Sequence, residues 1–214
     1  MEEKTLDSQE SMALISEMIQ RSKTRRFIGD GNIMLLWGYL TVGVALLVWG
    51  LLALTRHPAM NWFWFLIWII GGTVTPVMVR RRRDKEGVTT YSDSICNALW
   101  AIVGWSCIAL TFLSLGFLLV GGKDCWSALL MLPLLIVGFA ETVQGVVMRE
   151  KSLVWGGAAG MLAGLFTLCC IASGVALCAG WFMPMFIVTF ALMMIVPGHI
   201  LNFKSRNVVK NERA

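Results

Sequence analysis

Six long apolar stretches, with the positive charges on one side of them, constrain the fold of this 214-residue chain more than any other feature. The N-terminal tail, the links after the second and fourth stretches, and the C-terminal tail carry five, five, two and four Lys and Arg residues, 16 of the 18 in the chain. The other three links carry only Arg56 and Lys123. Cytoplasmic links of membrane proteins are enriched in Lys and Arg. The alternation therefore predicts an even number of membrane crossings with both termini in the cytoplasm.

The apolar runs are continuous, so they predict an all-α membrane protein rather than a barrel of alternating strands. About 20 helical residues cross the hydrocarbon core. No charged residue lies between Ser152 and Phe203, a length that suits two spans with a break near Leu177–Trp181. The predicted organisation is a cytoplasmic tail over 1–32, a six-helix bundle over 33–203 and a second cytoplasmic tail over 204–214. The six predicted transmembrane helices cover 33–54, 60–79, 95–120, 126–148, 153–176 and 181–203.

The first, third and fifth spans open alike, with Leu36-Trp37-Gly38, Leu99-Trp100-Ala101 and Val154-Trp155-Gly156. One interpretation is a threefold repeat of tandem helical hairpins in the same orientation. The other is that each helix places a tryptophan at the membrane interface, as membrane helices commonly do. Both interpretations stay open at the level of sequence.

Gly156, Gly160 and Gly164 stand four residues apart in the fifth span. Small residues at this spacing line one face of a helix and let a neighbouring backbone approach closely. The pattern predicts a packing helix, whose partner is either another helix of the same chain or a second copy in a homo-oligomer.

Residues 7–26 have the pattern of a cytoplasmic amphipathic helix that precedes the first span. Met12, Ile15 and Ile19 form an apolar stripe, and Asp7 and Glu10 suit the start of a helix. Such a helix either lies in the membrane interface or docks a cytoplasmic protein.

The run Arg80, Arg81, Arg82 and Arg83 follows the second span directly. Arginines at this position stop transfer and contact lipid head groups. The chain is 57% apolar and 14% charged, with a net charge of +5. Because membrane topology already accounts for the basic residues, we expect the lipid bilayer as a partner and no nucleic acid.

Glu141 is the only Asp, Glu, Lys or Arg inside a predicted span, and it lies eight residues, about 12 Å of helix, before Arg149. An ionised carboxylate in hydrocarbon is costly, so this group should be protonated, paired or exposed to water. One hypothesis is an intramembrane polar site of Glu141, Gln144 and His199, with Thr73 and Thr75 from the second span, which carries a proton or holds a cation or head group. The other is a neutral Glu141 bonded between helices, with His199 reaching the interface.

The six cysteines form no metal-binding motif, and no cofactor-binding or catalytic motif is present. The sequence therefore predicts no catalytic residues, no metal, no cofactor and no enzyme. Cys125 and Cys178 both fall at the predicted outer face, where oxidising conditions allow a disulfide between them.

The run Leu35–Leu40, the pair Gly71-Gly72, and Thr89-Thr90-Tyr91 ahead of Leu99-Trp100 resemble uncharacterised small multi-pass inner-membrane proteins of Bacteroides-type bacteria. The resemblance covers about residues 10–110 and implies an accessory or regulatory membrane protein, without implying site residues.

The sequence thus supports two functional hypotheses for a protein of the bacterial inner membrane. The first is an accessory or sensor protein that acts through lipid or protein binding. The alternative is a transporter, or an ABC-2-like permease subunit, with a polar site at Glu141.

Overall fold

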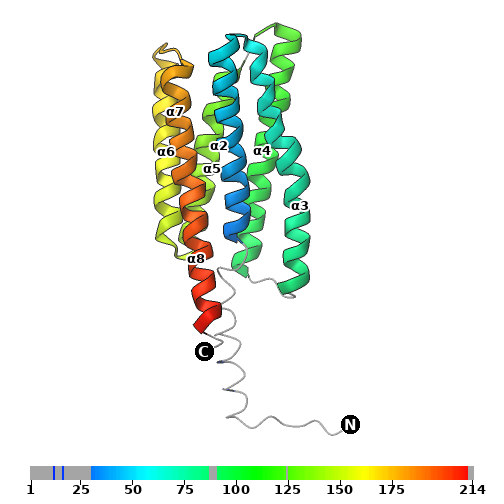
Figure 1. Ribbon diagram of the computed structural model, residues 1–214, viewed down its shortest axis with the longest axis vertical. Helices are drawn as coiled ribbons and strands as arrows, with labels where there is room; N and C mark the ends of the chain where they lie inside the picture. The colour runs from blue at the N-terminus through cyan, green and yellow to red at the C-terminus, as the bar shows by residue number, and fades with distance from the viewer. Residues whose placement is uncertain (1–11, 13–15, 17–29, 87–90, 124, 212–214) are drawn as a thin grey trace.

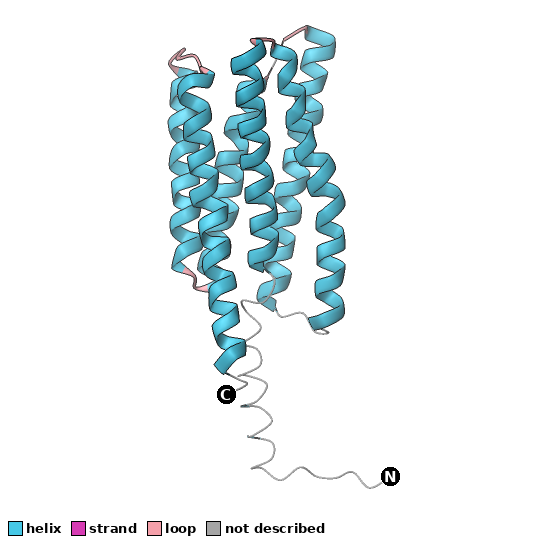
Figure 2. Cartoon of the chain, viewed as in Figure 1, coloured by secondary structure: helices cyan, strands magenta, loops and turns pink. Residues whose placement is uncertain are grey.

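The computed structural model describes Met12, Ser16 and residues 30–86, 91–123 and 125–211. Within these ranges the protein is all-helical and contains no strand (Figure 2). The described residues form six helices that are long and apolar enough to cross a membrane, which indicates a membrane-embedded protein. The predicted amphipathic helix over 7–26 lies outside the described residues, apart from Met12 and Ser16, which are helical.

The six long apolar helices alternate in direction along one axis (Figure 1). The start of α2 and the end of α8 lie at the same end of the bundle, which we call the terminal end; the turn between Thr55 and Pro58 lies at the opposite end. The elements in chain order are α2 (Asp30–Thr55), the 3₁₀ helix η1 (Pro58–Phe65), α3 (Leu66–Glu86), α4 (Tyr91–Gly121), α5 (Trp126–Met148), α6 (Lys151–Ala172), α7 (Ala179–Phe190), the π-helical turn η2 (Ala191–Ile195) and α8 (Val196–Asn211).

The contacts between helices describe an open ring. α2 packs against α3 on one side and against α7, η2 and α8 on the other. α6 contacts both α8 and α5, and α5 in turn contacts α4. α3 makes its main contacts with α2 and η1, and α4 makes its own with α5. The ring is therefore loosely closed between α3 and α4, although these two helices follow one another in the chain.

Two helices extend beyond their predicted limits. α3 continues through Arg80–Arg83 to Glu86 instead of ending near Val79, because Arg, Lys and Glu favour helix and the next glycine after the arginines comes only at Gly87. α4 begins at Tyr91 rather than near residue 95, with Asp93 in its first turn, where a carboxylate interacts favourably with the helix dipole.

The break between the last two spans lies earlier than the predicted Leu177–Trp181. α6 ends at Ala172, and Gly174 turns the chain with φ of +73°, a conformation that glycine adopts at little cost. The helix resumes at Ala179, so Gly180 and Pro184 lie inside α7 and do not break it.

The buried apolar residues form two clusters along the bundle. The first includes Leu134 of α5 and a column of rings on α7, where Phe182, Phe186 and Phe190 follow one another at centroid distances of 5.9 and 4.7 Å. The second joins α2, α4, α5, α6 and α8 through Met34, Cys96, Met148, Leu153 and Leu201. Along α5, Glu141 and Gln144 lie between the residues that belong to these two clusters.

Candidate functional site

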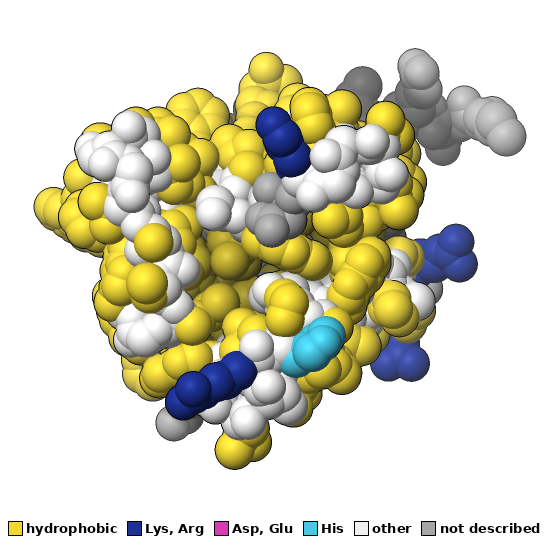
Figure 3. Space-filling view, turned by 90° about the horizontal axis from the view of Figure 1, so that it is seen from above, with side chains coloured by type: hydrophobic (Ala, Val, Ile, Leu, Met, Phe, Trp, Pro, Cys, Tyr) yellow, Lys and Arg dark blue, Asp and Glu magenta, His cyan; other side chains and the backbone are white. Residues whose placement is uncertain are grey.

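A groove runs inside the ring, between the loosely joined helices α3 and α4 and the walls made by α2, α5 and α7. Its volume is about 910 Å³, near the upper limit of the range of about 300–1,000 Å³ that is typical of ligand sites. Figure 3 looks down the bundle from the opposite end, where mostly apolar side chains surround the recess. A space of this size within a membrane protein is a candidate binding site for a small molecule or a lipid.

The groove extends along most of the bundle. On α4 its wall runs from Asp93, two residues into the helix, to Thr111. At helical rise these residues are about 27 Å apart, close to the hydrocarbon thickness of a bilayer. Asp93, Ser94 and Asn97 make the terminal end of this wall polar, whereas the opposite end is lined by rings such as Trp64 and Trp126. The groove is therefore amphipathic along its length.

Tryptophans line this groove, among them Trp37 and Trp100, for which an interface position is one of the two interpretations of the sequence. Trp37 donates its indole N–H to the Thr75 hydroxyl at 3.1 Å, which ties α2 to α3. Trp100 donates to the Gln144 side-chain carbonyl at 2.8 Å, which ties α4 to α5. The buried indole N–H of Trp64 has no partner in the described part of the chain. Tryptophan suits such a wall because its ring is apolar and its single donor is polar.

Gly71 explains how the ring of Trp37 fits. A Cβ at this position of α3 would lie 2.5 Å from the Trp37 ring, so only glycine admits the indole between α2 and α3. The two glycines of the Gly71-Gly72 pair therefore differ: Gly71 is buried against α2, whereas Gly72 is exposed and a Cβ added there would meet no atom within 4 Å.

The structure does not bring the predicted polar site together as one cluster. Gln144 and Thr75 line the groove, but Glu141 and His199 do not. His199 is exposed and pairs with the Tyr39 hydroxyl at 2.7 Å across α2 and α8. Thr73 is also exposed, and its hydroxyl donates to the carbonyl of Ile69 in its own helix.

Glu141 instead lies on the side of α5 that faces away from the groove and toward α6. Its side chain is completely buried, and neither carboxyl oxygen has a hydrogen-bond partner among the described residues. A Cβ on Gly156 of α6 would meet its Oε1 atom at 2.9 Å and the Leu192 carbonyl oxygen at 3.1 Å. Glu141 is therefore enclosed between α5, α6 and the π turn η2. Leaving a buried polar group unpaired costs about 1–3 kcal/mol, and more for a charge.

The predicted glycine face of α6 finds its partners within the same chain. Gly156, Gly160 and Gly164 are all buried. Side chains added there would meet Glu141, Met193 and Leu135, respectively, from α5 and η2. Gly157 and Gly138 complete the contact, because a Cβ on Gly138 would lie 2.8 Å from the Gly157 carbonyl. The alternative of a second copy is not needed to explain this stripe.

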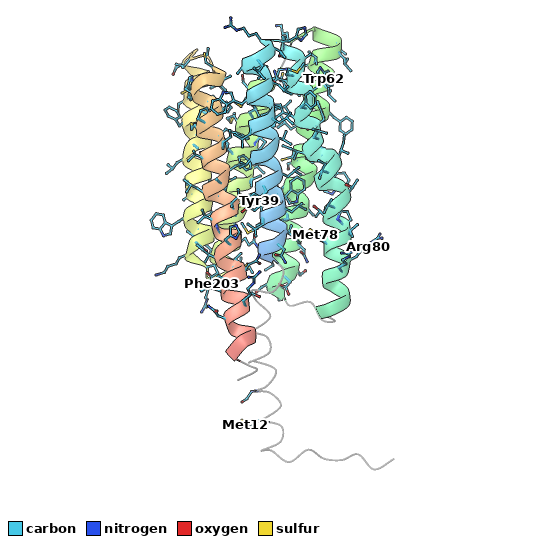
Figure 4. The ribbon with its side chains drawn as sticks, viewed as in Figure 1. Met12, Tyr39, Trp62, Met78, Arg80 and Phe203 are labelled. Atoms are coloured by element: carbon cyan, nitrogen blue, oxygen red, sulfur yellow. The ribbon has the colours of Figure 1, made fainter. Side chains whose placement is uncertain are left out.

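The remaining predicted residues lie at the surface. Arg80 and Arg81 are exposed on α3, and Figure 4 shows Arg80 pointing away from the bundle. Arg82 and Arg83 continue the same helix, and their side chains fall outside the described part. All six cysteines are free thiols, so the predicted disulfide between Cys125 and Cys178 is not formed.

Sequence reasoning missed the groove and the π turn. Residues of four helices and η1 line most of the groove, and no sequence pattern predicts which faces of these helices meet around it. The π turn had one local signal, Pro197, which lies two residues after its end at Ile195, because proline removes a backbone donor from a helix.

No protein-family model, curated protein or solved structure matches this chain. The fold and the site define its class on their own: a helical, membrane-embedded protein with an amphipathic groove between its helices.

Proposed function

We propose that this chain is a non-enzymatic protein of the bacterial inner membrane, with both termini in the cytoplasm, that binds one lipid or similar long-chain amphiphile in its groove. Binding of this kind suits the accessory or sensor role that the sequence predicts. The observation that carries the proposal is the cavity of about 910 Å³ with a mostly apolar wall, which lies behind two helices that barely contact each other.

The chemistry of the wall favours an amphiphile over a polar solute. Rings of α2, η1 and α5 line much of the length, which suits an acyl chain. Ser94 and Asn97 offer hydrogen-bonding groups at the terminal end, where a head group would lie. In a bilayer, lipid is the abundant ligand with this combination of apolar chain and polar end.

Two glycines of α4 provide a matched test. Neither Gly104 nor Gly116 has an atom within 4 Å of an added Cβ, but only Gly104 lines the groove. We expect Gly104→Trp to fill the groove and displace the lipid, while Gly116→Trp leaves it bound. The protein is purified in mild detergent, and bound lipid is measured by native mass spectrometry and by extraction.

Equal lipid retention in the two variants, or no lipid bound to the wild-type protein, would contradict the proposal. If the groove instead holds a helix of a second copy, the wild-type protein is a dimer by light scattering and Gly104→Trp makes it monomeric. That result would also replace the lipid proposal.

The length of the groove favours a second candidate, a permease subunit that moves an amphiphile across the membrane. A path of about 27 Å approaches the thickness of the hydrocarbon core. An ABC-2-like subunit depends on a separate ATPase, so capture of an ATPase from native membranes, together with lipid movement in proteoliposomes that requires ATP, would favour this candidate.

A further inference from the structure

Glu141 is a buried acidic group within a span, and the groove does not explain its surroundings. It is fully buried, and both of its carboxyl oxygens lack a hydrogen-bond partner within the part of the chain that the structure describes. On α5, Leu134 lies two turns before Glu141 and belongs to the first apolar cluster, and Met148 lies two turns after it and belongs to the second. An ionised carboxylate is costly in such an apolar setting, so this group should be protonated and hydrogen-bonded or paired with another group.

The π turn supplies an acceptor beside this carboxyl group. In a regular helix the N–H of Val196 donates to the carbonyl of Leu192, but here it donates to Ala191. The next possible donor is residue 197, which is proline and has no N–H. The Leu192 carbonyl therefore accepts no hydrogen bond from the N–H of residue 196 or from residue 197, the two positions whose backbone donors would ordinarily reach it. π turns of this kind are frequent at functional sites.

Gly156 brings the two unsatisfied groups together. The Glu141 Oε1 atom and the Leu192 carbonyl oxygen lie 2.9 and 3.1 Å from the same point, the position that a Cβ on Gly156 would take. Any larger residue on α6 would separate α5 from the last helix at this level. A protonated carboxyl group is a donor, and a free carbonyl is an acceptor, so the pair is chemically complementary.

We propose that Glu141 is a proton-binding site in which the protonated carboxyl group donates its O–H to the Leu192 carbonyl and fastens α5 to the π turn of the last helix. Loss of the proton removes the donor and leaves two acceptors facing each other, which releases this link. The site does not depend on the lipid groove, from which Glu141 is separated by α5.

The route for the proton runs toward the terminal end. Ser152 lies one helical turn before Gly156 on α6, and its hydroxyl oxygen is buried without a partner. Beyond it, Lys204 of α8 and the buried Glu150 form an ion pair at 2.5 Å. Other charged side chains described on these helices are exposed, namely Arg149, Lys151 and Arg206, and His199 is exposed and paired with Tyr39.

Infrared spectroscopy tests the protonation directly. The difference spectrum between the wild-type protein and Glu141→Gln in proteoliposomes should contain one carboxylic acid carbonyl band at neutral pH. The band should shift in D₂O and convert to carboxylate bands as the pH is raised. Glu150→Gln, which changes the other acidic group on this route, should leave the band in place.

A second variant tests the acceptor. Pro197→Ala restores a backbone N–H that competes for the Leu192 carbonyl, so the Glu141 carbonyl band should move toward the position of a weaker hydrogen bond. Thermal unfolding of each variant verifies that it is folded.

Carboxylate bands at neutral pH in the difference spectrum would overturn the proposal, and so would bands that depend on Na⁺, which would show a cation site instead. A band that is identical in Pro197→Ala and the wild-type protein would rule out the Leu192 carbonyl as the partner.

Discussion

The two sides of the ring are built on different principles. In the most apolar part of α5, 44% of the residues are buried inside the protein, whereas the corresponding share is 11% for the span formed by η1 and α3 and 17% for α4. α5 and α6 meet through glycines with their backbones in close contact, and α4 reaches its neighbours mainly through large side chains such as Trp100. We call α5, α6, α7 and α8 the packed half, and α3 and α4 the open half.

The difference shows how a small membrane protein separates rigidity from access. In the packed half the helix backbones are in close contact, and these contacts form only because glycine has no side chain. The open half leaves apolar side chains to the surrounding lipid, so its helices can separate at little cost. Under the proposed function, a ligand enters the groove through the open half while the packed half keeps its shape.

The largest effect is expected from breaking the backbone contact of the packed half. In Gly157→Leu the new Cβ would lie 2.5 Å from the Gly138 carbonyl, which is backbone and cannot move aside. We expect the free energy of unfolding to fall by roughly 3 kcal/mol, since overpacking typically costs 1–3 kcal/mol and sometimes more. Gly116→Leu in the open half, with no atom near it, should change almost nothing. Chemical denaturation in bicelles measures both, and equal effects would erase the distinction between the halves.

The next effect tests the ion pair at the base of the packed half. Lys204→Ala leaves the carboxylate of Glu150 buried without its partner. Exposed pairs are worth less than 1 kcal/mol, and breaking a buried one costs 3–5 kcal/mol. Because Lys204 is 46% exposed and Glu150 only 8%, we expect a loss of about 1–3 kcal/mol. Adding Glu150→Gln to Lys204→Ala should restore most of the stability in the same denaturation measurement; no recovery would mean that the pair is unimportant.

A smaller effect is expected at the link between the halves. Trp100→Phe removes the hydrogen bond that joins α4 to Gln144 of α5 and keeps most of the ring. A net loss of about 1 kcal/mol is typical of such a bond. Trp105→Phe, on the same helix but 72% exposed, is the control and should be neutral. If both variants unfold at the same denaturant concentration, the hydrogen bond does not hold α4 in place.

The smallest effect should come from Tyr39→Phe, which removes the hydrogen bond to His199 on the outer surface of α2 and α8. Side-chain hydrogen bonds between membrane helices contribute about 0.6 kcal/mol on average. These helices also pack closely, as at Gly198 of α8, where a Cβ would lie 2.9 Å from Leu35 of α2. A loss well above 1 kcal/mol in bicelles would show that polar bonds, rather than packing, join α2 to the last helix.

The sequence predicted the helical class and the number of long apolar helices, because hydrophobic length and the absence of strand patterns are local properties. It also predicted that the Gly156, Gly160 and Gly164 face packs closely, since spacing along one helix sets which residues share a face. The topology, the hairpin repeat and the bacterial inner membrane stay predictions.

The site was harder to predict for a physical reason. Glu141 and Gln144 are three residues apart, so they point in similar directions along α5, yet one contacts α6 and the other contacts α4. Which neighbour a residue meets depends on how six helices are arranged around the ring, and no local pattern encodes that. Trp37 and Trp100 show the same limit: their positions near helix ends fit the membrane interface, but their rings turn into the groove.

The connection between α5 and α6 has a consequence for the synthesis of the protein. α5 ends at Met148 and α6 begins at Lys151, and Arg149 adopts a left-handed conformation with φ of 56° to reverse the chain. A loop this short brings the two helices together with little loss of chain entropy. They can enter the bilayer as a preformed hairpin, with Glu141 already lying against Gly156. The acidic residue that would most hinder insertion of a single helix is then shielded from lipid by the helix that follows it.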